Sequence, residues 1–213
     1  MKLIYIGDPM CSWCYGFGKE LSALTRRVPD LDLEIVVGGV RAGATDVLDD
    51  VGKRFRLGHW TRVQTLSGLP FNRAAFMARE GFVYDTEPVC RAVVTARHFL
   101  EGHRLLEAFR AFQHAFYADG LDTTDGRVLA EIATSALRNV GKVITIEEFL
   151  RMWSSNDLIA QTRHDFVRAR ALGATSFPTL LLEKDGQIHD VAIGYATVDV
   201  LERRLSLLET QLI

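Results

Sequence analysis

Two cysteines separated by two residues are the part of this sequence best suited to chemistry. They lie in the segment Cys11-Ser12-Trp13-Cys14. Two thiols at this spacing can make and break a disulfide, because one sulfur attacks a substrate disulfide and the other resolves the mixed disulfide that results. The same spacing is also half of a zinc site. A short structural disulfide and a chance pair are two further interpretations, and the surrounding residues must decide among them.

The residues around the pair predict a strand followed by a helix. Residues 3–6 are apolar or aromatic, and Gly7-Asp8-Pro9 is typical of a turn. Apolar residues then recur at helical spacing, namely Phe17, Leu21 and Leu24. The first backbone N–H groups of a helix and the positive end of its dipole favour an anion such as a thiolate. We therefore predict that Cys11 is the activated nucleophile and that Cys14, one turn later, is the sheltered resolving thiol.

The remaining cysteine and the histidines give little support to a metal site. A zinc site would need two more ligands, usually a second close pair. Cys90 is far away in the sequence, and none of the six histidines forms a Cys/His pair with it. We therefore predict no metal and interpret the N-terminal pair as redox-active. Cys90 lies among apolar residues of a predicted helix and is interpreted as a buried, inert thiol, with a third redox partner as the alternative.

The composition indicates an ordinary globular protein. Of its 213 residues, 48% are hydrophobic and 24% are charged, and the formal net charge is −2. Nucleic-acid binding usually needs a basic stripe, which is not seen. We also see no apolar run that could span a membrane and no signal-peptide core. An odd number of cysteines suits a reducing compartment. We predict a cytoplasmic protein with neither nucleic acid nor membrane as a partner.

The order of the predicted elements gives an α/β fold interrupted by helices. Strands at 2–6 and 31–37 flank the helix at 11–27, which predicts a β-α-β unit with parallel strands. The next predicted elements are all helical, at 46–57, 59–66, 73–80, 86–100, 103–117, 127–139, 145–153 and 157–172. Strands return at 180–182 and 191–193, joined by a turn at Asp185-Gly186. The last predicted helix covers 198–212.

This order divides the chain into two domains. Residues 1–44 and 173–213 form a discontinuous domain, and residues 45–172 form a helical insertion domain large enough for a core of its own. Helix caps are expected at Thr86, at Thr124 or Asp125, at Thr145 in a capping box with Glu148, and at Thr197.

A resemblance to a known family follows from these features. The order β-α-β…β-β-α, with Cys-x-x-Cys opening the first helix and Pro178 opening the third strand, resembles the thioredoxin fold. The helical insertion resembles the DsbA branch. The segment 8–14 resembles the cytoplasmic bacterial FrnE-type DsbA-like proteins. Four more segments are similar to that group and extend the resemblance over nearly the whole chain, namely 68–71, 80–88, 116–120 and 175–179.

The resemblance implies a thiol–disulfide oxidoreductase or isomerase that acts on protein or small-molecule disulfides. It implies Cys11 as the nucleophile and a cis peptide bond before Pro178. The backbone of Phe177 is then expected to pair with an extended substrate, and Ser12 and Trp13 are expected to contact it. No cofactor is expected beyond the two thiols, with glutathione as the candidate electron partner. The expected partners are disulfide- or thiol-containing proteins or glutathione.

Departures from the family pattern leave alternatives open. Ser12-Trp13 replaces the Pro-His of the strongly oxidising periplasmic enzyme, so no cation lies between the cysteines and extreme oxidising power is not expected. The kappa-class glutathione transferases and 2-hydroxychromene-2-carboxylate isomerases are similar in architecture but carry serine in place of Cys11. A glutathione-dependent transferase or isomerase is therefore the alternative enzyme. A peptide-binding holdase is the non-enzymatic alternative. The aromatic residues Trp13, Tyr15 and Phe17 would offer a peptide platform to either the oxidoreductase or the holdase, although packing in the core is favoured for Phe17.

Overall fold

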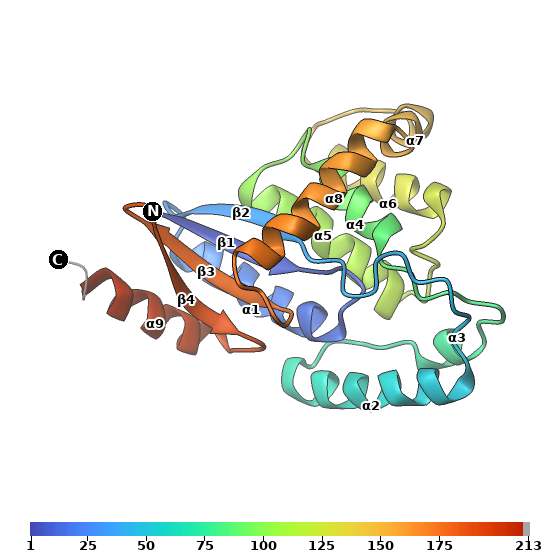
Figure 1. Ribbon diagram of the computed structural model, residues 1–213, viewed down its shortest axis with the longest axis horizontal. Coiled ribbons are helices and arrows are strands. Elements are labelled where there is room, and N and C mark those ends of the chain that lie inside the picture. The colour runs from blue at the N-terminus through green and yellow to red at the C-terminus, as the bar shows by residue number, and fades with distance from the viewer. Residues whose placement is uncertain (211–213) are drawn as a thin grey trace.

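The four strands of the sheet run in the order β2-β1-β3-β4 in the computed structural model, which describes residues 1–210 (Figure 1). The strands are β1 (Lys2–Gly7), β2 (Asp32–Val37), β3 (Thr179–Lys184) and β4 (Gln187–Ile193). β1 is parallel to β2 and antiparallel to β3, and β3 pairs with β4 as a hairpin. The predicted α/β fold, with its parallel first pair of strands and its antiparallel hairpin, is therefore confirmed.

Side chains on the central strands alternate between two apolar layers, as expected for a sheet that is covered on both faces. Leu3 and Tyr5 belong to the larger core, whereas Ile4 and Ile6 face the smaller one. The turn between β3 and β4 uses Asp185 and Gly186 at φ 51° and 75°. Positive φ at both central residues is the geometry of a type I′ hairpin turn, for which Asp-Gly is a preferred sequence.

Nine helices are described within residues 1–210. α1 (Ser12–Arg27) connects β1 to β2, and α9 (Val198–Thr210) follows β4. The helices between β2 and β3 are α2 (Asp50–Ser67), α3 (Arg73–Met77), α4 (Glu87–Ala96), α5 (Gly102–Tyr117), α6 (Gly126–Asn139), α7 (Ile146–Trp153) and α8 (Asn156–Ala171). In residues 1–210 no helix is long and apolar enough to cross a membrane.

The helices cover the two faces of the sheet differently. α1 and α5 pack on the face that carries Tyr5, whose ring contacts Phe17 of α1 and Phe109 of α5. The opposite face is covered by the C-terminal part of α8, where Ala169 joins the smaller core. Figure 1 shows α8 crossing in front of β1 and β2, with both chain termini at the far end of the sheet from α2 and α3.

Several predicted boundaries are corrected by the structure. The separate helices expected at 46–57 and 59–66 are one helix, α2, which begins after the N-cap Asp49 and ends at Ser67, with Gly68 as its C-cap. α3 and α4 are shorter than predicted and end at Met77 and Ala96. The predicted end of the last helix at residue 212 lies outside the described residues. The capping box of Thr145 with Glu148 is confirmed.

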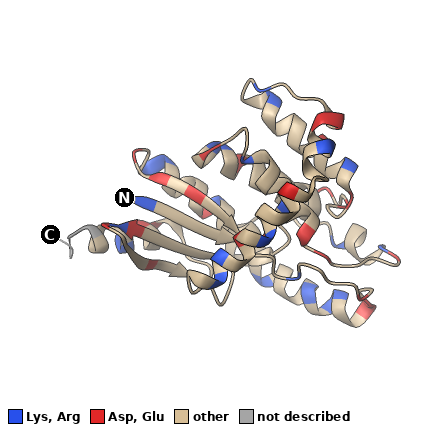
Figure 2. Cartoon of the chain, turned by 45° about the horizontal axis from the view of Figure 1, so that its top comes forward, with Lys and Arg blue, Asp and Glu red and all other residues tan. Residues whose placement is uncertain are grey.

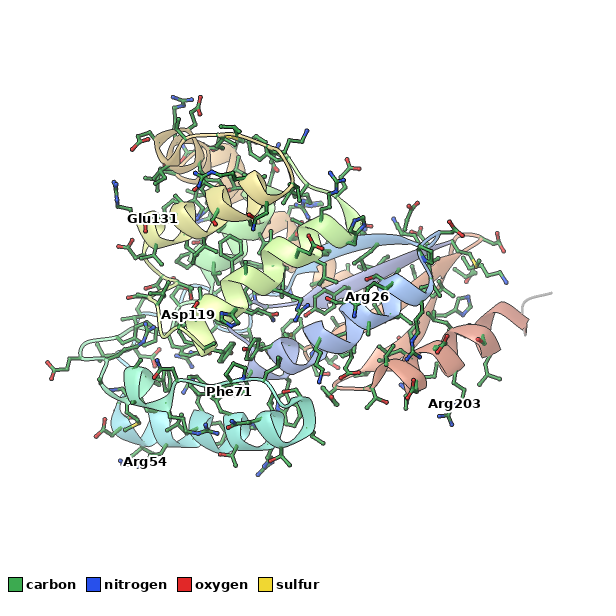
Figure 3. The ribbon with its side chains drawn as sticks, turned by 180° about the vertical axis from the view of Figure 1, so that it is seen from behind. Arg26, Arg54, Phe71, Asp119, Glu131 and Arg203 are labelled. Atoms are coloured by element: carbon green, nitrogen blue, oxygen red, sulfur yellow. The ribbon has the colours of Figure 1, made fainter. Side chains whose placement is uncertain are left out.

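A cluster of aromatic rings holds α2 against the rest of the molecule. Trp60 of α2 lies with its ring centroid 4.5 Å from that of Phe76, 5.2 Å from Phe71 and 5.1 Å from Tyr117. Figure 3 shows Phe71 between α2 and the helices above it, whereas Arg54 points away from the body of the molecule. The buried face of α2 therefore fixes its position beside the start of α1.

Positive and negative side chains are interspersed over most of the chain (Figure 2). α2 is an exception, because it carries Lys53, Arg54, Arg56 and Arg62 against the single acid Asp50. α2 is therefore locally positive, which the net charge of the chain does not indicate.

Candidate active site

Cys11 is the N-cap residue of α1, with extended backbone angles of φ −90° and ψ 117°. Its N–H donates to the Asp8 carbonyl at 3.0 Å, which closes the turn after β1. Within residues 1–210 its side chain makes no capping hydrogen bond. The half-buried thiol instead donates to the backbone carbonyl of Phe177, with the sulfur 3.7 Å from the oxygen. The Cys11 thiol therefore lies at the positively polarised start of α1 and faces the loop before β3.

Cys14 lies one turn further along α1 and is fully buried. Both cysteines are free thiols, and they lie near each other at the start of α1. Burial raises the pKa of Cys14 well above its usual range, and the nearby Cys11 adds to this rise, whereas the Asp8 backbone N–H acts in the opposite direction. The two thiols therefore differ in access in the way the sequence predicts.

The loop before β3 brings Phe177 and Pro178 to the thiol pair. The Phe177–Pro178 peptide bond is cis, and Pro178 is buried. The Phe177 ring rests on Gly38, where a side-chain carbon would lie 2.2 Å from the ring. The absence of a side chain at Gly38 thus allows the Phe177 ring to pack there, which positions the carbonyl that faces Cys11.

The two residues between the cysteines are both half-buried. The Trp13 indole N–H donates to Nδ1 of His59 on α2 at 3.3 Å, and the ring lies 6.4 Å from that of Tyr195. The predicted residues Cys11, Cys14, Phe177 and Pro178 are thus brought together, whereas Trp13 is turned toward α2. Ser12 follows Cys11 at the first position of the helix.

The other two aromatic residues of the predicted peptide platform are core residues. Tyr15 is 4% exposed, and its ring stacks on Tyr117 with centroids 4.8 Å apart. Phe17 is completely buried against Tyr5. A platform made of all three rings is therefore wrong, and among them Trp13 alone remains available to a substrate.

Asp8 is a site residue that the sequence analysis treated only as part of a turn. Its fully buried carboxylate accepts hydrogen bonds from the backbone N–H groups of Met10 at 2.8 Å and Val40 at 2.7 Å. Burial raises its pKa to about 6, although these hydrogen bonds act to lower it. Asp8 therefore ties the turn before Cys11 to the loop after β2. The sequence does contain a signal for a role of Asp8 at the site. Asp8 lies three residues before Cys11, inside the segment 8–14 that carries the family resemblance.

Cys90 lies beneath this turn as a fully buried residue of α4. Its thiol donates to the Asp8 carboxylate, with the sulfur 3.6 Å from Oδ2, and burial raises the pKa of Cys90 well above its usual range. A protonated thiol shielded from solvent is a poor nucleophile. These observations support the interpretation of Cys90 as an inert thiol.

We therefore expect Cys90→Ser to leave the rate of disulfide exchange nearly unchanged. A serine hydroxyl can donate to the same carboxylate, so the turn before Cys11 should keep its shape. The measurement compares the rates of reduction of a protein disulfide by the native chain and by the variant. A large loss of rate in a variant with an unchanged circular dichroism spectrum would assign Cys90 to the mechanism.

The described residues do not place a metal centre near the thiols. In residues 1–210, no group of three or more His, Cys, Asp or Glu side chains is arranged to hold a metal ion.

Comparisons with known proteins agree with this geometry. No protein-family model and no curated protein matches the chain. Among solved structures, a candidate protein disulfide isomerase from Nitrosomonas europaea is similar at 29% identity and a TM-score of 0.86, over 99% of each chain. The cytosolic disulfide reductase DsbM from Pseudomonas aeruginosa is 27% identical at a TM-score of 0.76, over 100% of this chain and 98% of its own.

A third similarity concerns the alternative enzyme class. A 2-hydroxychromene-2-carboxylate isomerase is 15% identical at a TM-score of 0.61, over 100% of this chain and 94% of its own. At this identity the likeness is one of fold. The two more similar structures indicate a function of the disulfide oxidoreductase type. The sheet order, the helical insertion and these neighbours together identify the chain as a DsbA-like protein of the thioredoxin fold.

Proposed function

We propose that this chain is a thiol–disulfide oxidoreductase in which Cys11 attacks a substrate disulfide and Cys14 resolves the product. The observation that carries the proposal is the asymmetry of the pair. Cys11 is half-buried at the start of α1 and faces the Phe177 carbonyl, whereas Cys14 is completely buried near Cys11. A structural disulfide or a zinc half-site does not require this difference.

The reaction proceeds in two exchanges. The Cys11 thiolate attacks one sulfur of a substrate disulfide, which forms a Cys11–substrate disulfide and releases the other sulfur as a thiolate that takes up a proton. The Cys14 sulfur, after losing its proton, attacks Cys11 and releases the second substrate sulfur. The chain ends with a Cys11–Cys14 disulfide, and the substrate has gained two electrons and two protons. Run backwards, the same steps oxidise a dithiol.

Substrate contacts are proposed on the surface around Cys11. The backbone of Phe177 beside Pro178 is proposed to pair with an extended chain, and Ser12 and Trp13 to contact residues next to the disulfide. Protein disulfides and glutathione disulfide are the proposed substrates.

Glutathione is also the proposed reductant of the Cys11–Cys14 disulfide. It carries two carboxylates, and α2, the helix that contacts Trp13 through His59, carries four cations against one acid. DsbM has been solved with glutathione, which supports the same choice here. That protein is cytosolic, and we propose the cytoplasm for this chain as well.

The proposal is tested by two assays on the native chain, the reduction of a protein disulfide with glutathione as the reductant and the conjugation of glutathione to an aromatic electrophile. We expect disulfide reduction well above the uncatalysed rate and no conjugation above it. Strong conjugation without disulfide exchange would favour the transferase class instead. A protein that prevents aggregation of unfolded chains but shows neither activity would favour the holdase.

A further inference from the structure

The outward face of α2 carries large apolar side chains in contact with solvent. Val51 is 66% exposed, Phe55 68% and Leu66 56%, whereas the buried side of the same helix carries Trp60 and Val63. The spacing of the three exposed residues places them on one face of the helix. A single exposed apolar residue needs no explanation, but several on one face mark a candidate interaction surface.

Aromatic rings connect this face to the thiol pair. The ring centroid of Phe55 lies 5.0 Å from that of His59, one turn later on α2. The His59 ring lies 6.4 Å from that of Trp13 and accepts the indole N–H at 3.3 Å. Trp13 stands between the two cysteines in the sequence. The exposed face of α2 therefore continues into the surface around Cys11.

The same face leaves room for another chain to lie on it. Gly58 is exposed in the middle of α2, and a side-chain carbon added there would meet no atom within 4 Å. Glycine inside a helix is destabilising relative to alanine, and no close neighbour requires it at this position. Gly58 lies three residues after Phe55, so its bare backbone is beside that ring. A partner backbone can approach closely at such a position.

The dimensions and charge of the face fit a short stretch of polypeptide. From Val51 to His59 the helix rises about 12 Å, which about four residues of extended chain span. Glutathione has a single residue on each side of its cysteine, so it does not span this length. Arg54 and Arg62 are exposed on the same helix and favour an acidic residue in the occupant. A disulfide to Cys11 holds one end of such a chain at the site.

We propose that the outward face of α2, with Val51, Phe55 and Gly58, binds the polypeptide beside the substrate cysteine and selects protein substrates with a large apolar residue within about five positions of it. The inference rests on the proposed function, because the mixed disulfide with Cys11 tethers the chain. In that exchange the Cys11 sulfur bonds to the substrate sulfur, and the other sulfur leaves with the electron pair and takes up a proton. Contact with α2 favours this step for polypeptides.

Two synthetic peptides of about nine residues test this inference. Each has a central cysteine joined by a disulfide to nitrothiobenzoate, whose coloured thiolate is released when Cys11 attacks the peptide sulfur. The apolar probe carries phenylalanine on both sides of the cysteine and an aspartate near each end, and the polar probe carries serine in place of phenylalanine. With the reduced native chain we expect the apolar probe to react about tenfold faster, as for partial burial of one phenylalanine side chain.

The double variant Val51→Ala/Phe55→Ala removes the exposed apolar side chains and introduces a good helix former. It should react with the two probes at nearly equal rates. Val143→Ala is the matched control, because Val143 is 87% exposed in the loop before α7, which lies on the opposite side of the molecule from α2 (Figure 1). A preference that survives in the double variant, or that Val143→Ala abolishes equally, would overturn the inference.

A second variant tests the contact without weakening the fold. Gly58→Gln adds a long side chain to the bare surface and favours the helix, so the thermal unfolding midpoint should not fall. The rate with the apolar probe should nevertheless fall severalfold, because the added side chain occupies the space for the peptide. An apolar-probe rate equal to that of the native chain would contradict binding across this face.

The remaining outcomes separate this inference from the proposed function. If the native chain releases nitrothiobenzoate from both probes no faster than Cys11→Ser does, the proposed function fails. If it reacts with both probes at one rate well above that of Cys11→Ser, the inference alone fails. Sedimentation of the native chain should show a monomer at the assay concentration. A dimer that Val51→Ala/Phe55→Ala abolishes would assign the face to a second copy of the chain and overturn the inference.

Discussion

Replacing Cys11 with serine should reduce the rate of disulfide exchange by at least about a thousandfold, because the attacking group is lost. A serine hydroxyl ionises far less readily than a thiol and needs an adjacent base to become a nucleophile. The contact that the Cys11 side chain makes is with the Phe177 carbonyl, which cannot remove a proton. Cys14 cannot replace it, because Cys14 is completely buried and its pKa is raised by burial.

The measurement is the initial rate of reduction of a protein disulfide, with the thermal unfolding midpoint recorded on the same samples. Cys90→Ser makes the same chemical change at a buried thiol outside the proposed mechanism and serves as the matched control. Cys11→Ser should fall to the uncatalysed rate while Cys90→Ser stays near the native rate. If Cys11→Ser retained most of its activity, Cys11 would not be the nucleophile.

The fold could be predicted from the sequence because its signals are local. Apolar runs such as 3–6 and 180–182 indicate core strands, and Asp185-Gly186 fits the positive φ angles of a tight hairpin. The helix start after Gly7-Asp8-Pro9 is equally local, so the position of Cys11 at the cap followed from the chain order. These features do not depend on distant contacts, which is why the order of elements along the chain and the asymmetry of the pair could be predicted together.

Helix boundaries were harder to predict, since packing decides them. α2 continues through Gly58 as a single helix, whereas two separate pieces were expected. Trp60 on its buried face packs against rings from α3 and α5, and this contact holds the helix together. Thr86 was predicted to cap α4 with its side chain. Instead its hydroxyl accepts a hydrogen bond from the Arg41 N–H at 3.2 Å. The Thr86 hydroxyl therefore binds the loop after β2, and it does not cap the helix.

The surroundings of the thiols could not be predicted, because they come from distant parts of the chain. Asp8 appears in the sequence as part of a turn, and the hydrogen bond that its carboxylate accepts from the Val40 N–H depends on how the loop after β2 packs against it. His59 is one of several scattered histidines, yet it accepts the Trp13 indole N–H from a different helix. Periodicity identifies which residues are buried but not which buried polar groups meet, so these roles emerge only from the three-dimensional structure.

The assignment of roles within the pair is tested most directly by trapping reaction intermediates. If Cys11 attacks first, a mixed disulfide forms that only a nearby thiol releases quickly. Cys14→Ser removes that thiol and leaves the attack intact, so covalent adducts with partner proteins should accumulate. Cys11→Ser should accumulate far fewer, because the remaining Cys14 is completely buried. Cys90→Ser should behave as the native chain.

The decisive measurement is the amount of adduct on non-reducing gels for Cys14→Ser and Cys11→Ser, with a reduced sample of each beside it. We predict abundant adducts for Cys14→Ser that disappear on reduction and almost none for Cys11→Ser. Equal trapping by the two variants, or no trapping by either while the native chain still catalyses exchange, would contradict the division of roles between Cys11 and Cys14.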